Sequence, residues 1–284
     1  MRRVKEIIRY RCKGILEYGW LGKDIVVVVM DTGVSPHPEL YGRIHGFKDF
    51  VNERPEMYDD NGHGTHVSGI IGGNTIGIAP ECNIIMLKVL DASGSGKIEY
   101  SMRGFRWIVE NQEKYNIRIV NISMGMEQSS DKIDINYILK AVEVLWDLGI
   151  VVVAAAGNLG PKEGTITIPG LSEKVITVGS ADLRYSGRGS LQQDIIKPDL
   201  VAPGSHIYSS NAKWKENGER YYIPKSGTSM STPIVSGAIA DLLSKNPNIT
   251  NTNVKKIIKH SCNNLGMDMM RQGNGMLDMS KLLK

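Results

Sequence analysis

The sequence predicts a three-layer α/β/α fold with a mostly parallel central sheet. Two observations carry this prediction. Five short β-branched runs are apolar on both faces, which is typical of strands in a covered parallel sheet. Helix-like segments alternate with these runs, and such alternation favours right-handed crossovers. No internal repeat, low-complexity tract or Pro/Gly-rich linker interrupts the pattern, so we expect residues 1–284 to form a single domain.

Each element follows from its local pattern, taken in chain order. The expected strands are DIVVVVMDT (24–32), NIIMLKVL (83–90), IRIVNIS (117–123), GIVVVAAAG (149–157) and KVITVGS (174–180). The expected helices are GTHVSGIIGG (64–73), YSMRGFRWIVENQEKY (100–115), IDINYILKAVEVLWDLG (133–149), TSMSTPIVSGAIADLLSK (228–245) and NTNVKKIIKHSC (251–262). The last helix begins at the cap signals Asn251 and Thr252.

Composition indicates an ordinary globular protein and excludes several classes of function. Hydrophobic residues make up 41% and charged residues 23%, and the net charge of +4 does not indicate a nucleic-acid partner. We interpret the basic stretch MRRVKEIIRYRCK as a solvated helix face. No apolar run is long enough to span a bilayer, and the N-terminus lacks the apolar stretch of a secretory signal. Three sparse cysteines, Cys12, Cys82 and Cys262, are interpreted as small buried residues. These features favour the cytoplasm, with a secreted mature form as the alternative.

The start of the helix at 228–245 is unusual. Ser229 stands between Gly227–Thr228 and Met230, and Pro233 follows before the first turn has closed. A hydroxyl there lies near the positive end of the helix dipole, beside backbone N–H groups with no helical partner. By itself the pattern leaves two interpretations, an ordinary N-cap and a nucleophile.

Ligands of open α/β sheets bind at the carboxyl ends of the strands, where this chain carries further polar residues. Asp31 ends the first strand, and alone it would indicate a simple Asp–Gly turn. His63 lies between Gly62 and Gly64 at a helix start. His66 follows without the HExxH pattern of a zinc site, so we interpret it as a packed structural histidine.

The strand at 149–157 ends in small residues followed by Asn158, whose side chain could donate an N–H into open space. As a lone motif this is a weak signal. Together the segments DTGV, NGHGTHVSG, AAAGN and SGTSMSTP, in this order, resemble the subtilases, the subtilisin-like serine proteases. The resemblance extends from about Gly19 to the C-terminus.

The resemblance implies a serine endopeptidase with an apolar preference at the residue before the scissile bond. Asp31 would orient His63, His63 would act as general base and then acid, and Ser229 would attack the peptide carbonyl. Asn158 and the Ser229 backbone N–H would bind the oxyanion. Two alternatives stay open: a non-catalytic member of the family that binds a peptide or regulates a partner, and a protease dedicated to processing one partner or leader peptide.

The resemblance also implies where a protein or peptide substrate lies extended, with neither nucleic acid nor membrane as a partner. Its binding edges would be Ser93, Gly94, Ser95 and Gly96 on one side and Ser123, Met124 and Gly125 on the other. The walls of the primary specificity (S1) pocket would be Ala154, Ala155, Ala156, Gly157 and Thr167. The next subsites look apolar through Ile98, Met102 and Met124, and Met126 replaces a glycine common in the family.

We expect no required cofactor. Many subtilases hold a tight calcium ion in a loop that interrupts the helix of the catalytic histidine. Here Glu39 matches the acidic ligand of that site, but the segment from the helix to Pro80 carries only Asn74 and Thr75 as polar side chains. We therefore predict that the tight site is absent and that Glu39 is a solvated surface carboxylate. A weaker calcium site elsewhere stays open.

Overall fold

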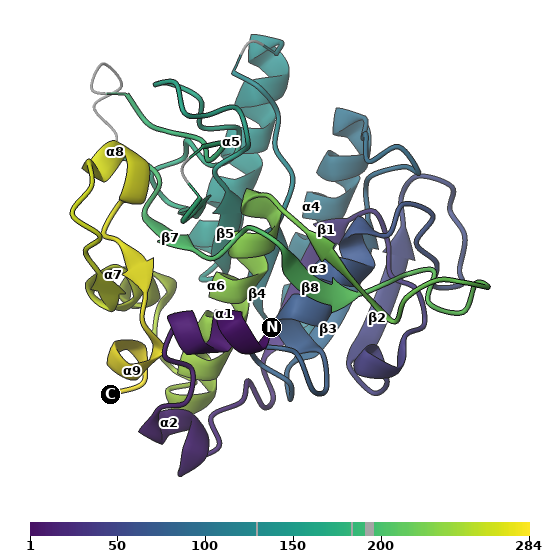
Figure 1. Ribbon diagram of the computed structural model, residues 1–284. Helices are drawn as coiled ribbons and strands as arrows, with labels where there is room; N and C mark the ends of the chain where they lie inside the picture. The colour runs from purple at the N-terminus through teal and green to yellow at the C-terminus, as the bar shows by residue number, and fades with distance from the viewer. Residues whose placement is uncertain (129, 183, 191–195) are drawn as a thin grey trace.

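The structure, a computed structural model, describes residues 1–128, 130–182, 184–190 and 196–284. A central sheet, one α-helical layer on each face and a short N-terminal segment make up the molecule (Figure 1). In this part of the chain the sheet has nine strands in the order β10–β11–β7–β6–β5–β4–β1–β3–β2. All neighbours pair parallel except β10 and β11, which are antiparallel. The predicted fold class is confirmed.

The strands of the sheet are β1 (Val26–Asp31), β2 (Ile44–Asp49), β3 (Asn83–Lys88), β4 (Ile117–Ile122), β5 (Val151–Ala155), β6 (Ile176–Ser180), β7 (Leu200–Ala202), β10 (Cys262–Asn263) and β11 (Met276–Leu277). A separate antiparallel hairpin pairs β8 (Ile207–Ser210) with β9 (Tyr222–Lys225). The helices are α1 (Arg2–Ile7), α2 (Lys13–Leu16), α3 (His63–Gly72), α4 (Ile98–Tyr115), α5 (Lys132–Asp147), α6 (Thr228–Lys245), α7 (Asn251–His260), α8 (Met269–Gln272) and α9 (Met279–Leu282), with a 3-10 turn at Pro38–Leu40.

Alternate residues of the buried strands point to opposite layers. In β1, Val27 and Val29 pack with α3 and α6, whereas Val28 and Met30 pack on the side of α4 and α5. Both faces of the strand are therefore apolar. This is the reason the central strands read as unbroken hydrophobic runs in the sequence.

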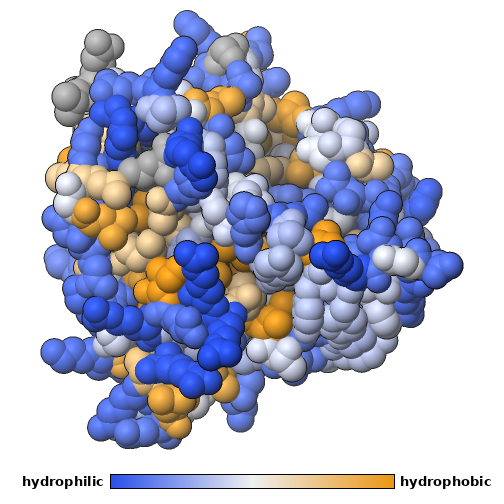
Figure 2. All heavy atoms as spheres, in the orientation of Figure 1, coloured by the Kyte–Doolittle hydropathy of each residue, from blue (hydrophilic) through white to orange (hydrophobic). Residues whose placement is uncertain are grey.

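The basic N-terminal stretch forms α1, which lies over the same layer as α6 (Figure 1). Val4 and Ile8 are buried against that layer, while Arg2 and Arg3 are exposed. On this face of the molecule, hydrophilic side chains predominate and the apolar ones form separate patches (Figure 2). The stretch is thus the solvated helix face that the sequence predicts, with a buried apolar side.

Candidate active site

Asp31 and His63 meet at the carboxyl end of β1. The Asp31 carboxylate accepts a hydrogen bond of 2.7 Å from Nδ1 of His63, and the aspartate side chain is fully buried. Burial by itself would lower the pKa of His63, but the charge of Asp31 and its hydrogen bond outweigh that effect and raise the pKa above its ordinary value. With the Nδ1 proton directed at Asp31, Nε2 is the basic nitrogen of the neutral ring.

A hydrogen-bond network that the sequence analysis missed holds these two residues. The Thr32 N–H donates to the Asp31 carboxylate over 2.7 Å, and the Thr32 hydroxyl donates to Asp59 over 2.8 Å. Asp59 also accepts from the backbone N–H groups of Gly62 and Thr65 at the start of α3. One buried carboxylate therefore joins the end of β1 to the helix that carries the histidine.

Both glycines around His63 have a structural reason. Gly62 precedes α3 with φ of +92°, in the left-handed region that favours glycine. A side chain on Gly64 would lie 2.2 Å from the carbonyl oxygen of Gly33, so only glycine allows α3 to approach the turn after β1 this closely.

Ser229 is the second residue of α6, half-buried at the helix N-terminus. Gly227 caps the helix with φ of +149°, and no side chain makes a capping hydrogen bond there. The N-cap interpretation of Ser229 is therefore wrong, because the cap is Gly227. The serine hydroxyl lies at the positive end of the helix dipole, where developing negative charge on oxygen is stabilised.

Asn158 follows β5 and is oriented by Thr228, the residue before Ser229. Its Oδ1 accepts hydrogen bonds from the Thr228 N–H (2.9 Å) and the Thr228 hydroxyl (3.2 Å). Because a backbone N–H can only donate, this contact identifies the oxygen of the amide and leaves Nδ2 as a free donor. The Thr228 hydroxyl in turn accepts from the Gly157 N–H (3.1 Å). Thr228 is a further residue that the sequence analysis missed.

The two predicted substrate edges lie around one pocket. Gly94, Ser95 and Gly96 line one side, and Met124 and Gly125 line the other, of a cavity of about 360 Å³. Ser93 is exposed beside this edge, and Ser123 is buried at the end of the other. The turn at 91–95 is closed by the Asp91 carboxylate, which accepts from the N–H groups of Ser93 and Ser95.

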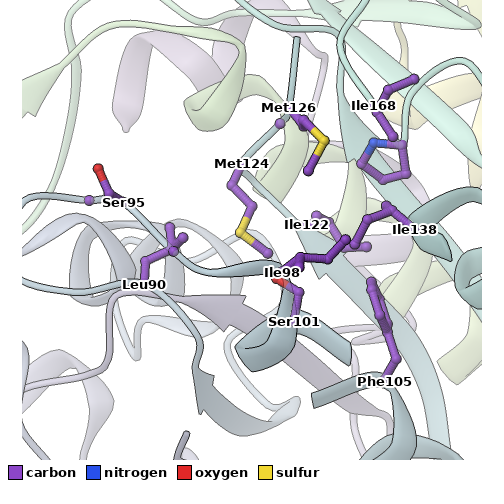
Figure 3. Close-up of a pocket in the computed structure, with 14 residues that line it drawn as sticks. Leu90, Ser95, Ile98, Ser101, Phe105, Ile122, Met124, Met126, Ile138 and Ile168 are labelled. Carbon is purple, nitrogen blue, oxygen red and sulfur yellow. The ribbon is translucent and has the colours of Figure 1, made fainter. Parts of the chain in front are cut away.

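Most of the side chains that line this pocket are apolar, although Ser95 and Ser101 also contribute. Its lining includes Ile98, Phe105, Ile122, Met126 and Ile138, and Figure 3 shows Met124 and Met126 extending into it from the same stretch of chain. Met126 also pairs with Ile168 through two backbone hydrogen bonds of 2.8 and 2.9 Å, which ties the pocket wall to the residue after Thr167. Met102 packs half-buried against the core on this side of the sheet but is not among the lining residues.

The residues predicted to form the S1 walls differ in how exposed they are to a substrate. Ala154, Ala155 and Ala156 are each at most 2% exposed, so they pack inside the sheet end instead of forming an open wall. Gly157 is half-exposed, and a Cβ placed on it would lie 2.5 Å from Thr167. A Cβ on Gly125 would lie 2.3 Å from the Thr167 hydroxyl. Thr167 thus fills the space between these two glycines.

Glu39 contradicts the sequence-based expectation of a solvated carboxylate. It is 3% exposed and accepts hydrogen bonds from the backbone N–H groups of Thr75 (2.8 Å) and Ile76 (3.3 Å), and from the hydroxyls of Thr75 and Tyr222. Burial raises the pKa of Glu39, but these donors together lower it below its ordinary value. The expectation is wrong because Tyr222, far away in sequence, covers the carboxylate.

The remaining predictions concern His66 and the cysteines. His66 is buried, and its Nε2 donates to the carbonyl oxygens of Ile207 and Ile223 in the β8–β9 hairpin, so the structural interpretation is confirmed. Burial lowers its pKa to about 3. All three cysteines are free thiols; Cys82 and Cys262 are buried, but Cys12 is only half-buried.

An Asp–His pair at the carboxyl end of β1 and a serine at the N-terminus of α6, on a mostly parallel α/β sheet, are the elements that the sequence analysis expects of a serine-hydrolase site. The sequence profile described as the Subtilase family matches residues 22–276, and the chain belongs to this family. No helix among the described residues is both long and apolar enough to cross a membrane.

Named relatives agree with this assignment. Serine protease AprX of Bacillus subtilis is 40% identical over 272 residues, which cover 84% of this chain and 61% of that protein. Subtilisin Savinase of Lederbergia lenta is 34% identical over 92% of this chain and 91% of its own length. A solved structure of a cold adapted subtilisin-like serine proteinase superposes with a TM-score of 0.77 at 31% identity, covering 91% of this chain and 90% of that one.

Proposed function

We propose that this chain is a serine endopeptidase that hydrolyses peptide bonds through Asp31, His63 and Ser229. The observation that carries the proposal is the 2.7 Å bond between the Asp31 carboxylate and His63 Nδ1, which leaves Nε2 basic at the site. The serine proteases among its relatives support the same reaction.

In the proposed reaction, the Ser229 oxygen bonds to the substrate carbonyl carbon while its proton passes to Nε2 of His63. The oxyanion is stabilised by Nδ2 of Asn158 and the Ser229 N–H. The carbonyl carbon then loses its bond to the amine, which leaves with the proton from His63. A water molecule, deprotonated by His63, then hydrolyses the acyl-enzyme and regenerates Ser229. Asp31 stays ionised and stabilises the charged imidazole.

The test is hydrolysis of an unfolded protein substrate by the wild type, Ser229→Ala and His63→Ala. Each variant should lose nearly all activity while keeping its fold, because triad members act as a unit. A Ser229→Ala protein that kept a tenth of the activity would contradict the nucleophile assignment. A wild type that bound peptides without cleaving them would favour a non-catalytic binding protein. A peptide-library profile separates broad digestion from processing of one partner.

We also propose that the tight calcium site of the family is missing. The Glu39 carboxylate does not fit that ion, because N–H and O–H donors from Thr75, Ile76 and Tyr222 already point at its oxygens. Calcium needs about six to eight oxygen acceptors arranged around it. Groups of three or more His, Cys, Asp or Glu that could hold a metal do not occur among the described residues either.

For location, we propose the cytoplasm. Three free thiols fit a reducing compartment. Fractionation of the source cells with an antibody to the chain tests this, and recovery of the protein in the culture medium would contradict it.

A further inference from the structure

Lys88 is a fully buried charged residue at the carboxyl end of β3. Its side chain is 0% exposed, and it lies in the run IIMLKVL, whose other members are apolar. An ammonium group without hydrogen-bond partners is strongly unfavourable in such a place.

Each of the three ammonium protons has one acceptor on a different segment. Nζ of Lys88 donates to the carbonyl oxygen of Thr32 (2.6 Å), to the carbonyl oxygen of Leu90 (2.9 Å) and to the carboxylate of Asp60 (2.7 Å). The ring of Tyr58 lies 5.0 Å from Nζ as a further cation–π contact. The donor capacity of the lysine is fully used.

All three segments lead into the proposed active site. Thr32 is the residue whose N–H holds the Asp31 carboxylate. Asp60 stands three residues before His63, and Leu90 begins the segment that ends in the edge 93–96. Backbone hydrogen bonds also join the end of β3 to the end of β1, because the N–H groups of residues 89 and 90 both donate to the Asp31 carbonyl oxygen.

We propose that Lys88 is a positioning residue for the reaction, one that fixes the Asp31 end of β1, the approach to His63 and the start of a substrate edge relative to one another. The inference rests on the proposed function. Lys88 itself cannot touch a substrate, because it has no exposed surface. It acts through the geometry of the triad, where a displacement of about 1 Å costs on the order of 100-fold in rate.

The chain offers a matched control in Lys197. That lysine is 1% exposed, and its Nζ donates to the carbonyl oxygen of Val175 (3.0 Å), the hydroxyl of Thr177 (2.8 Å) and the carboxylate of Asp199 (2.8 Å). It matches Lys88 in burial and in donating to a backbone carbonyl oxygen and a carboxylate, with the Thr177 hydroxyl in place of a second carbonyl oxygen. Its partners belong to the neighbourhood of β6 and β7, and none of them is a residue of the proposed triad.

The experiment compares Lys88→Met with Lys197→Met below both melting temperatures. Active sites are counted by labelling with a fluorophosphonate to completion, and kcat on a peptide anilide is expressed per labelled site. We expect kcat of Lys88→Met to fall by about 10- to 100-fold, and that of Lys197→Met to stay within about threefold of the wild type. Equal kcat values in the two variants, whether both are lowered or both unchanged, would overturn the proposal.

A second variant covers the case in which Lys88→Met does not fold. Asp60 is 35% exposed, so Asp60→Ala removes one connection without opening a core cavity. Asp147→Ala, which removes a surface ion pair with Lys174, is its control. We expect kcat per labelled site to be about 3- to 10-fold lower in Asp60→Ala. The control, Asp147→Ala, should keep the wild-type kcat. A wild-type kcat in Asp60→Ala would overturn the proposal, whereas an inactive wild type would contradict the proposed function instead.

Discussion

Replacing Asn158 by leucine removes one donor from the proposed oxyanion hole while keeping a side chain of similar size. The amide is held by its oxygen, which accepts from the N–H and the hydroxyl of Thr228. Nδ2 is thereby free, and it lies near Gly227, on which a Cβ would be 3.2 Å from that nitrogen. Because the side chain is exposed, leucine leaves no cavity, but it removes the acceptor of the buried Thr228 N–H and should lower the free energy of unfolding by about 1–3 kcal/mol.

The expected loss in transition-state stabilisation depends on which oxyanion donors remain in Asn158→Leu. Two donors are assigned to the oxyanion, and the Ser229 N–H keeps its place at the start of α6 in the variant. Loss of one such donor costs about 2.7–4 kcal/mol, or about 10²- to 10³-fold in kcat, a magnitude taken from the equivalent asparagine of a subtilisin. KM should change little, because the oxyanion exists only after attack.

The assay is steady-state hydrolysis of a peptide anilide, with kcat and KM determined separately. Asn158→Asp is the matched control, because it keeps an oxygen for the Thr228 N–H but carries no N–H donor. Both variants should lose kcat. A loss mainly in KM would make Asn158 a ground-state binding residue. Near-normal kcat in Asn158→Asp would mean that the anchoring of Thr228, and not the donor, matters.

Four further predictions concern pH, calcium and specificity. Catalysis needs neutral His63, and Asp31 raises the pKa of that residue, so kcat/KM should fall as the pH drops through a value above about 6.5; a midpoint below 6 would contradict the pairing. Ser229→Ala, which cannot digest itself, should melt at nearly the same temperature in excess EDTA and in millimolar calcium, and a drop of about 10 °C or more in EDTA would contradict the missing site. Wild type should prefer apolar or medium-sized residues over Lys and Arg before the scissile bond, because an unpaired buried cation is unfavourable. Thr167→Gly should shift a peptide-library profile about 10-fold or more toward aromatic residues, and an unchanged profile would remove Thr167 from the S1 pocket.

The layers of the fold could be predicted because the central strands are buried on both faces. Val26–Asp31 and Val151–Ala155 contain no exposed residue, so apart from the terminal Asp31 their sequences are apolar without interruption. The hairpin of β8 and β9 was missed for the opposite reason. β9 has no buried residue and includes Pro224, so its sequence carries neither alternation nor a hydrophobic run.

The residues proposed to react could be recognised from local motifs, but the residues that hold them in place could not. Asn158 and Thr228 are 70 residues apart, and Glu39 and Tyr222 are 183 apart. Such hydrogen bonds depend on the folded chain and leave no local pattern. Lys88 did leave a signal that was overlooked: a single charged residue inside an apolar strand must find buried partners, which here are Thr32, Leu90 and Asp60.

Covalent labelling with a fluorophosphonate tests the central claim most directly, because the probe reacts only with an activated serine. The account predicts one label per chain, located by peptide mass spectrometry on Ser229, with labelling abolished in Ser229→Ala and strongly slowed in His63→Ala. Wild-type protein that stays unlabelled, or a label on another serine that persists in Ser229→Ala, would contradict the assignment of Asp31, His63 and Ser229 as a catalytic triad.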